Sequence, residues 1–575
     1  MDRLIACRWR STACVLVLAL LLGQAVAPVL AAETTESVAD GAGKVSKAKR
    51  TRYSPADDTA REGEDGADEL PMDPSIPRAS MQDLEKHYQL SSAPANSLQL
   101  PPPALPDLSR YTPATAAARI NRRVKGTVSV GSLLNEPGFK SLTTAIGQGL
   151  SELAKRQQGS LRAIFIEHGY VSLPELAATL PGAVFQQVSP GVFVTRLPIL
   201  VRHGATLEIG RGVKTLRLSQ ERGTMLAVEG TLYVANATIT GWSESANKPT
   251  WFKKKTEFRP FIVGWGGSKM YIVGSRIAHL GYASTKAFGL SMSQYSTTVA
   301  QRAVWPRPTG WILNTEIHDL WYGYYCWEAD DVVLRGNTFK ENILYGIDPH
   351  DRSERLIIAE NIAYGTRKKH GIIISREVNN SFIISNKSYG NALSGIVLDR
   401  QCSGNIIANN LTYQNRSDGI VLSESPNNRL WGNLSTGNLH HGIRLRNSTG
   451  IRIEQNSAIG NGLSGIYGVA RSLAGTDRDF HHDPYTKSMS MTVMGGQYTG
   501  NGSGPINVEE PYEVALYDLD LRTPQRALGY RFGGVLLAYQ TELLDILIKQ
   551  KLVAKLERRP TAAPSAQPVP TALKR

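Results

Sequence analysis

Cysteine is scarce in this sequence, and its scarcity limits the sites that the chain can build. Only four cysteines occur among 575 residues. They form no Cys-X-X-Cys pair, and no cysteine–histidine spacing typical of structural zinc is present. Cys7 and Cys14 lie near the amino terminus, so Cys326 and Cys402 remain for the rest of the chain. The sequence therefore predicts no zinc-stabilised fold.

Long apolar runs are scarce as well. An apolar run from Ala13 to Leu22 follows three arginines, and small residues surround Ala31 and Ala32. The run is short for a membrane-spanning helix, which needs about 20 residues. This pattern predicts a secretory signal over residues 1–32, cleaved near Ala31 or Ala32. The sequence offers no other candidate span, so we expect an exported product without a membrane span in the mature chain.

Long helical patterns and leucine-rich repeats are missing from the central part of the chain. Residues 191–525 instead alternate short apolar runs with Gly, Asn, Asp and Ser. A Gly-Ile pair recurs, with successive glycines 25, 24, 24, 23 and 23 residues apart. A period in this range, with a short strand in each unit, is typical of a solenoid, and the β-rich pattern favours a parallel β-helix. The pairs begin at Gly346, Gly371, Gly395, Gly419, Gly442 and Gly465.

Side-chain alternation divides each repeat into an inner and an outer set. The residues one and three positions after each of the first five glycines are apolar, so they point into the solenoid. The residues two and four positions after the glycine point outward, which places Asp348 and His350 on one outer face. Stacked strands lie about 4.8 Å apart, so Arg376 lies roughly one rung from Asp351. A histidine, an arginine and two carboxylates are therefore expected to meet on one exposed surface.

An asparagine also recurs ahead of each glycine. Several of these asparagines fall in Asn-X-Ser/Thr sequons, but the asparagine recurs where the sequon does not. This favours a stacked asparagine ladder at a turn over a set of glycosylation sites. The ladder is expected to contain Asn337, Asn361, Asn386, Asn410, Asn433 and Asn456.

The repeat register also separates the two remaining cysteines. Cys326 falls at an inward position, and Cys402 lies past a strand three units further on. Three rungs are too far for a disulfide, so we expect two buried free thiols.

The flanking segments have other compositions. Residues 33–110 are rich in Ala, Ser, Pro and charge, which predicts a disordered or extended linker. Residues 111–190 look like a mixed cap region, with an amphipathic helix over Phe139–Gln157 near the open end of the solenoid. The repeats are clearest over 314–470. Residues 526–558 predict an amphipathic helix that caps the far end, and 559–575 form a loose tail. The expected fold is all-β, a parallel β-helix with helical caps at both ends.

The formal net charge is +14. Basic side chains gather around the central repeat, and a basic stripe along a solenoid suits an extended polyanion. An ordinary solvated surface is the alternative. Export and the absence of a nucleic-acid-binding motif disfavour nucleic acid, so an acidic polysaccharide fits better. The stripe contains Arg352, Arg355, Arg367, Lys368, Lys369, Arg376, Arg400, Arg444 and Arg446.

The Asp-Pro-His-Asp cluster at 348–351 has both a structural and a functional interpretation. Asp-Pro favours turns, and a single histidine is often structural. Here two acidic residues flank His350 at positions where most other repeats carry Ile, Val or Ser. This context favours a functional site.

Three segments carry a resemblance to a known family. They are YGIDPHDRS from Tyr345, KKHGIIISREVN from Lys368 and LSGIVLDR from Leu393. Together they resemble the periplasmic mannuronan C5-epimerases of bacterial alginate biosynthesis, over roughly residues 110–550. The resemblance implies a right-handed β-helix with a polymannuronate groove, in the periplasm and beside alginate export proteins. It also implies that His350 is the catalytic base and that Arg376 neutralises the uronate carboxylate.

The family's reaction explains why these residue types are needed. Removing the C5 proton of mannuronate places negative charge on an already anionic group, so a bidentate arginine at the carboxylate is favourable. A histidine suits the base because its pKa lies near working pH. Asp348 and Asp351 could hold the imidazole or contact sugar hydroxyls. The acid on the opposite face is left open between water and a tyrosine such as Tyr345.

The wider substrate site is expected to be made of one tyrosine and several cations. Calcium-binding nonapeptide repeats are absent, so we expect neither a calcium requirement nor another metal or cofactor. The expected substrate-binding residues are Tyr345, Arg352, Lys368, Lys369, Arg400, Arg444 and Arg446.

Two other functions remain open from the sequence. A polyuronate lyase shares the first proton abstraction and then expels the C4 oxygen. A non-catalytic polysaccharide-binding or export scaffold would use the same basic groove without needing His350.

Overall fold

A computed structural model describes most of the chain beyond its amino-terminal segment. The expected signal 1–32, residues 33–85 of the expected linker and residues 561–575 lie outside the described residues. Within the described part, no helix is long and apolar enough to cross a membrane. The described residues are 86–98, 100–146, 149–159, 161–476, 478–481, 483–521 and 531–560.

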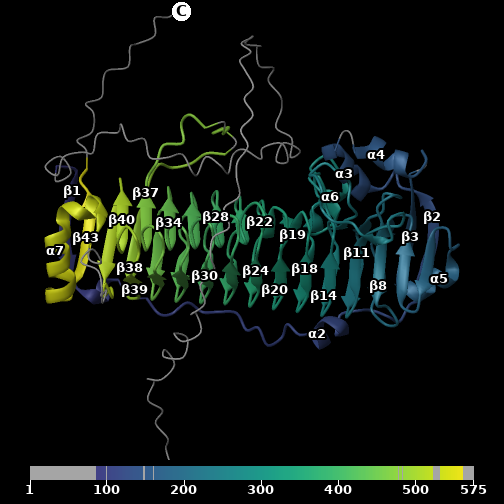
Figure 1. Cartoon of the computed structure of the whole chain (residues 1–575), viewed down its shortest axis with the longest axis horizontal. Coiled ribbons are helices and arrows are strands. Elements are labelled where there is room, and N and C mark those ends of the chain that lie inside the picture. Colours follow the sequence, from purple (N-terminus) through teal and green to yellow (C-terminus); the bar gives the residue numbers. More distant parts are fainter. Residues whose placement is uncertain are drawn as a thin grey trace, which may run out of the picture. The chain divides into compact units, whose positions relative to one another are not determined.

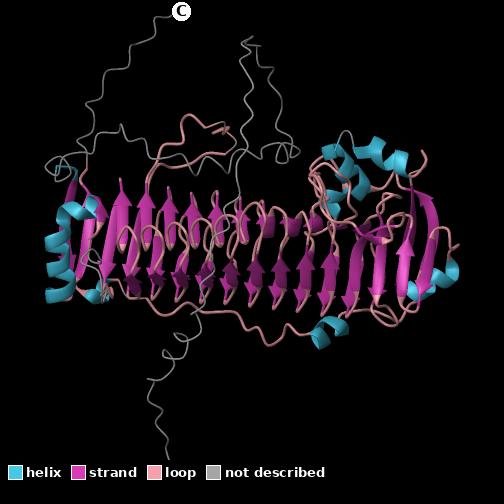
Figure 2. Cartoon of the chain, viewed as in Figure 1, coloured by secondary structure: helices cyan, strands magenta, loops and turns pink. Residues whose placement is uncertain are grey.

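The described chain winds into a parallel β-helix with three strands in each turn (Figures 1 and 2). The strands that follow the Gly-Ile pairs stack on one another and form the face that we call the Gly-Ile face. Its parallel strands are β6 (Ile199–Val201), β9 (Leu226–Val228), β13 (Ile262–Gly264), β16 (Gly289–Ser293), β19 (Tyr322–Trp327), β22 (Tyr345–His350), β25 (Ile372–Ser375), β28 (Ile396–Asp399), β31 (Ile420–Ser423), β34 (Ile443–Arg446), β37 (Ile466–Val469) and β40 (Ile506–Glu509).

The chain then passes to a second and a third face before it returns to the Gly-Ile face. The second face contains β7 (Ala205–Ile209), β10 (Thr231–Ala235), β14 (Lys269–Val273), β17 (Thr309–Leu313), β20 (Val333–Arg335), β23 (Ile357–Ala359), β26 (Phe382–Ile384), β29 (Ile406–Ala408), β32 (Arg429–Trp431), β35 (Ile451–Glu454), β38 (Ser490–Met494) and β41 (Glu513–Tyr517). The third face contains β5 (Val192–Thr195), β8 (Thr215–Ser219), β11 (Thr238–Ser243), β15 (Arg276–Ala278), β18 (Glu316–His318), β21 (Thr338–Lys340), β24 (Ile362–Tyr364), β27 (Lys387–Tyr389), β30 (Leu411–Tyr413), β33 (Leu434–Thr436), β36 (Ser457–Ile459) and β39 (Gln497–Thr499).

Strand register confirms the predicted alternation. Ile347 of β22 lies beside Ile372 of β25, and Ile372 lies beside Ile396 of β28. These inward side chains are fully buried in one core that runs through the described solenoid. Cys326 and Cys402 are buried there as free thiols, as expected from their separation.

The asparagine ladder is also confirmed. Each side-chain amide donates to the side-chain oxygen of the asparagine one turn further on, from Asn337 to Asn456. Each amide also donates to a backbone carbonyl of the preceding turn, as Asn410 does to Ile383 at 2.7 Å. The ladder therefore satisfies buried polar groups at a turn, where water does not reach them.

The amino-terminal end differs from its expected form. The helix expected over 139–157 is divided into α3 (Pro137–Ile146) and α4 (Gly149–Arg156), and their described apolar residues pack outside the main core. Figure 1 shows both beside the strands, whereas α5 (Leu173–Thr179) lies at the end of the solenoid. Leu173 and Leu176 of α5 are buried in the main core. α5 therefore covers this end, and strands begin earlier than residue 191.

Three further strands complete this end. β3 (Arg162–Ser172) pairs with both β6 and β7, which joins the first two faces. β2 (Thr127–Ser132) lies antiparallel to β3, and β4 (Phe185–Ser189) lies antiparallel to β5. The remaining short elements are β12 (Lys248–Pro249), beside β11, and α6 (Gln301–Val304).

The carboxy-terminal cap is only partly helical. Residues 526–530 of the expected helix lie outside the described residues, and within 531–558 the helical elements are η4 (Val535–Tyr539), α7 (Gln540–Leu544) and η5 (Asp545–Gln550). Its apolar residues do pack on the main core. The chain then forms β43 (Val553–Arg558), antiparallel to β41, while β42 (Gly533–Gly534) lies beside β40.

Residues 86–98 and 100–110 of the expected linker are extended but packed on the solenoid, so the disordered alternative is wrong for them. β1 (Tyr88–Ala93) pairs antiparallel with β43, after which η3 (Ala95–Ser97) begins a strap that reaches α2 (Pro113–Ala118). Arginines of the second face donate to its carbonyls, as Arg335 does to Leu108 and Arg429 to Pro101. The strap is ordered by partners more than two hundred residues away, which local composition does not reveal.

We expect Asn410→Ala to destabilise the solenoid by about 3 kcal/mol, because it leaves several buried groups of neighbouring turns without hydrogen bonds. Those groups include the backbone and side-chain N–H groups of Asn386. Urea unfolding followed by circular dichroism measures the change. Asn96→Ala, at an exposed position of η3, is the control and should change stability by less than about 0.5 kcal/mol. Equal stability of the two variants would contradict a stabilising role for the ladder.

Candidate functional site

β22 carries the Asp-Pro-His-Asp cluster at the middle of the Gly-Ile face. Its register places Asp348 beside Tyr325 of β19 and His350 beside Trp327. On the other side, His350 lies beside Ser375, so Arg376 follows on the next rung. The predicted neighbours are therefore brought together.

The cluster is not on the open surface that alternation predicted. Asp348 is 2% exposed and Asp351 is 7% exposed, while the His350 side chain retains 17%. Aromatic side chains of β19 and of the preceding turn form a second apolar layer on the outside of the Gly-Ile face. We call this layer the outer aromatic cluster, and it contains Phe288, Trp321, Tyr325, Trp327 and Tyr345 together with Ile343, Leu344, Ile373, Val397 and Val421.

His350 and Asp351 form a tight hydrogen-bonded pair. Nδ1 of His350 contacts the Asp351 carboxylate. A carboxylate only accepts hydrogen bonds, so Nδ1 carries the proton and Nε2 presents its lone pair. Asp351 has a φ of 37°, in the left-handed region that non-glycine residues rarely adopt. The turn after β22 therefore orients the imidazole for proton transfer at Nε2.

Burial and neighbouring charges shift the pKa values of His350 and Asp351 in opposite directions. Burial lowers the pKa of His350, but the charge of Asp351, the hydrogen bond to it and the charge of Asp348 raise the pKa by more. Burial raises the pKa of Asp351, whereas His350, Arg376 and Lys286 hold that pKa well below its usual range. Asp351 is therefore ionised, and the imidazole is more basic than an ordinary histidine.

Arg376 lies directly beside the pair. Its carbonyl accepts a hydrogen bond from the backbone N–H of Arg352 at 2.8 Å, next to the bond from Asp351 to Ser375. Its charge is close enough to lower the pKa values of both His350 and Asp351. A partly exposed guanidinium at this point can bind an anionic group that contacts His350.

Two neighbours of the histidine were missed by the sequence interpretation. Lys286 is 9% exposed, and its Nζ donates to the Tyr325 hydroxyl at 2.9 Å. The same Nζ lies 4.3 Å from the centroid of the Trp327 ring. Lys286 lies outside the 23–25-residue repeat and so gave no periodic signal. The aromatic run from Tyr322 to Trp327 was the available signal.

The expected substrate cations fall into two groups. Arg352 and Lys368 have exposed side chains, with Arg352 bound to Glu328 and Lys368 lying 5.6 Å from the Trp321 ring centroid. Lys369 is partly exposed, and Tyr345 stacks on His370 with ring centroids 6.0 Å apart. The second group lies further along the face and is largely enclosed.

Each arginine of the second group holds a carboxylate of the chain. Arg400 contacts Asp399 and Asp483, Arg444 contacts Asp418, and Arg446 contacts Glu424. Asp483 belongs to the loop between β37 and β38, which reaches back over this part of the face. These cations are therefore partly neutralised within the protein.

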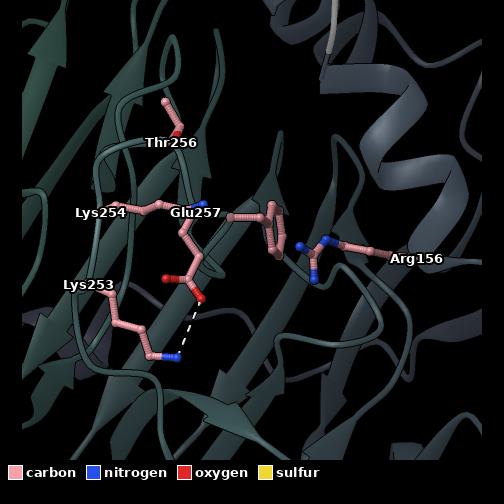
Figure 3. Close-up of a pocket in the computed structure, with 6 residues that line it drawn as sticks. Arg156, Lys253, Lys254, Thr256 and Glu257 are labelled. Atoms are coloured by element: carbon pink, nitrogen blue, oxygen red, sulfur yellow. Dashed lines mark ion pairs between the residues drawn. The ribbon is translucent and has the colours of Figure 1, made fainter.

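A basic pocket lies towards the amino-terminal end of the solenoid. It is lined by Arg156, Lys253, Lys254, Thr256, Glu257 and Phe258 (Figure 3). Lys253 pairs with Glu257 at 3.8 Å, and the Arg156 guanidinium lies 5.0 Å from the Phe258 ring centroid. The neighbouring Phe252 packs on Trp321 of the outer aromatic cluster. The pocket does not contain His350.

No metal-binding group is apparent in the part of the chain that the structure describes. Within it, no three His, Cys, Asp or Glu side chains converge on a position that could hold a metal ion.

Known proteins resemble this chain over most of its length. The model named "Right handed beta helix region" matches residues 322–476, which establishes the handedness of the solenoid. Mannuronan C5-epimerase of Pseudomonas aeruginosa is 53% identical over 81% of this chain and 85% of its own length. Mannuronan C5-epimerase AlgG of Azotobacter vinelandii is 50% identical over 81% and 88%. The solved periplasmic alginate epimerase AlgG is 46% identical, with a TM-score of 0.72 over 74% of this chain and all of its own.

We expect His350 to titrate above the ordinary histidine pKa of about 6.5, because Asp351 and Asp348 favour the imidazolium. Asp351→Asn should lower this pKa, since it removes the largest favourable charge. Titration of isotope-labelled histidine by NMR measures both values, with the signal assigned from its loss in His350→Ala. Asp545→Asn removes a carboxylate at the carboxy-terminal cap and should leave the His350 titration unchanged. An unchanged pKa in Asp351→Asn would contradict the pairing.

Proposed function

The chain belongs to the mannuronan C5-epimerase family, and we propose that it converts D-mannuronate residues to L-guluronate within polymannuronate during alginate biosynthesis. The single observation that supports this most directly is the His350–Asp351 pair, next to Arg376, in a chain about 50% identical to curated members. The reaction needs a base, a carboxylate-binding cation and a second proton donor. The first two are adjacent on the Gly-Ile face.

His350 acts as the base. Its Nδ1 proton is held by Asp351, so Nε2 removes the proton from C5 of a bound mannuronate. The imidazolium that results is stabilised by Asp351, and by Asp348 on the same strand. Asp348 and Asp351 therefore position the base and favour its protonated form rather than receive the C5 proton themselves.

Arg376 neutralises the uronate carboxylate. When C5 loses its proton, the electron pair spreads into the carboxylate at C6 and increases the negative charge there. A guanidinium binds both carboxylate oxygens through two parallel hydrogen bonds, so it stabilises this intermediate more than the ground state. Because Arg376 lies close to His350, a sugar whose carboxylate is bound by Arg376 has its C5 next to the base.

The polymer lies along the Gly-Ile face. Tyr345, Arg352, Lys368 and Lys369 contact the sugars nearest the reacting one. Further along, Arg400, Arg444 and Arg446 contact uronate groups only in competition with the carboxylates that they already hold. This competition keeps the binding to each sugar weak, which suits an enzyme that acts at many positions of one chain.

The proposal includes a periplasmic location. The related solved structure is described as a periplasmic alginate epimerase. The signal expected over residues 1–32, with cleavage near Ala31 or Ala32, provides the route of export. Contact with proteins of an alginate export assembly is also part of the proposal and follows from the family resemblance.

His350→Ala should reduce guluronate formation by about 1000-fold, because general-base catalysis is lost. Purified protein is incubated with polymannuronate in D₂O, and NMR measures guluronate, C5 deuterium and unsaturated chain ends. His168→Ala, at an exposed position far from β22, is the control. New unsaturated ends from the wild type would identify a lyase. Unchanged polymer with intact binding would identify a scaffold, and either result would contradict the epimerase proposal.

Arg376→Lys should lower kcat by about 100-fold with a smaller change in KM, because lysine retains the charge but not the two parallel hydrogen bonds. Initial rates over a range of polymannuronate concentrations give both constants. Arg276→Lys, at an exposed ion pair with Glu316 on the third face, is the matched control. An increase in KM alone would show that Arg376 binds substrate without stabilising the intermediate.

A further inference from the structure

Tyr325 and Lys286 form a hydrogen-bonded pair beside the histidine. Lys286 Nζ donates to the Tyr325 hydroxyl at 2.9 Å. An ammonium has no lone pair, so the phenol oxygen accepts this hydrogen bond and its own proton points elsewhere. Lys286 also lies over two aromatic rings, with its Nζ 4.8 Å from the Tyr325 ring centroid and 4.3 Å from that of Trp327. The ammonium is thus held beside both rings, and its charge also lowers the pKa of Asp351.

The backbone supports this placement. Lys286 has a φ of 62°, in the left-handed region, although it is not a glycine. Strained residues of this kind persist where surrounding structure holds them, and they are frequent at functional sites. The neighbouring Phe288 packs against the Tyr325 ring, with centroids 4.8 Å apart. The tyrosine ring is therefore fixed on one side by Phe288 and at its hydroxyl by Lys286.

Tyr325 and His350 lie on neighbouring rungs of the Gly-Ile face. Their ring centroids lie 5.9 Å apart, and the rings are tilted by 33°. Tyr325 belongs to the rung before His350, and Arg376 belongs to the rung after it. A sugar whose carboxylate is bound by Arg376 can therefore meet both groups.

The other tyrosine near the histidine is placed differently. Tyr345 stacks on His370, and its ring lies 5.1 Å from that of Tyr322. Both contacts lie at the beginning of β22, whereas His350 ends that strand. Tyr345 therefore lies at the start of β22, whereas the hydroxyl of Tyr325 accepts a hydrogen bond from a cation beside the base.

We infer that Tyr325 is the acid that returns a proton to C5 from the face opposite His350, and that Lys286 is the residue that positions and stabilises it. This inference rests on the proposed function. It identifies a further catalytic residue for that reaction and a positioning residue behind it.

Protons and electrons balance in the resulting sequence. Nε2 of His350 takes the C5 proton, and the electron pair of the C–H bond passes into the carboxylate, which Arg376 binds. The Tyr325 hydroxyl then gives its proton to C5, and the new C–H bond forms on the opposite face. The tyrosinate that remains is paired with the Lys286 ammonium, while the imidazolium is paired with Asp351. Transfer of the histidine proton to water and of a water proton to tyrosine restores both groups.

The test separates proton removal from inversion. Wild type, Tyr325→Phe, Lys286→Met and His350→Ala are each incubated with polymannuronate in D₂O, and NMR measures C5 deuterium separately in mannuronate and guluronate. Without its acid, the enzyme can still remove the C5 proton and return deuterium to the same face. Tyr325→Phe should therefore form guluronate about 100-fold more slowly while still deuterating mannuronate. Lys286→Met should slow guluronate formation by about 10-fold with the same pattern.

Tyr389→Phe is the matched control, because it removes a hydroxyl from a stacked tyrosine of the third face. Thermal melting and polymer binding of every variant are compared with this control. Guluronate formation by Tyr325→Phe within about threefold of wild type would overturn the inference. Loss of mannuronate deuteration as well, in a folded variant that binds polymer, would also overturn it, since Tyr325 would then act through the base. Absence of guluronate from the wild type would overturn the proposed function, and this inference with it.

Discussion

The in-register stacking of successive turns is the constraint on which the rest of the structure depends. Parallel strands keep corresponding residues about 4.8 Å apart from turn to turn, and the asparagine ladder holds the same register at a buried corner. Residues that are 25 to 50 positions apart in sequence thereby become neighbours on one face. Tyr325, His350 and Arg376 lie on three consecutive rungs for this reason alone. A shift of one residue in any of these strands would send its side chain to the core.

The outer aromatic cluster changes what the stacked residues can do. In a bare solenoid, His350 and its carboxylates would lie in water, where charges interact weakly. Here the pair is largely buried, with Trp327 of the outer aromatic cluster beside His350, so the charge of Asp351 acts strongly on the imidazole. The same enclosure keeps an ammonium close to the Tyr325 hydroxyl. The site therefore combines the stacked strands of the repeat with the outer aromatic cluster that covers them on the outside.

Both ends of the solenoid, and one side of it, are covered by segments that lie outside the repeat. α5 covers the first turn, while β43 continues the second face beyond β41 and receives β1 from the other end of the described chain. The strap then follows the second face back to α2, bound by arginines that project from that face. The second face is thus covered, whereas the cations beside His350 belong to the Gly-Ile face. The second face therefore binds the strap, and the Gly-Ile face carries the candidate site.

The sequence by itself determined the repeating part of the protein. A 23–25-residue period, apolar residues at alternate positions and a recurring asparagine were enough to place the core, the ladder, the two free thiols and the closeness of His350, Asp351 and Arg376. The tertiary structure alone decided the burial of that site, the position of Lys286, the pairing of the distal arginines and the order of residues 86–112. Periodicity reports contacts between equivalent positions of neighbouring turns. Lys286, Asp483 and β1 make their contacts from loops and ends that have no equivalent in the repeat, so those contacts form only once the turns have stacked.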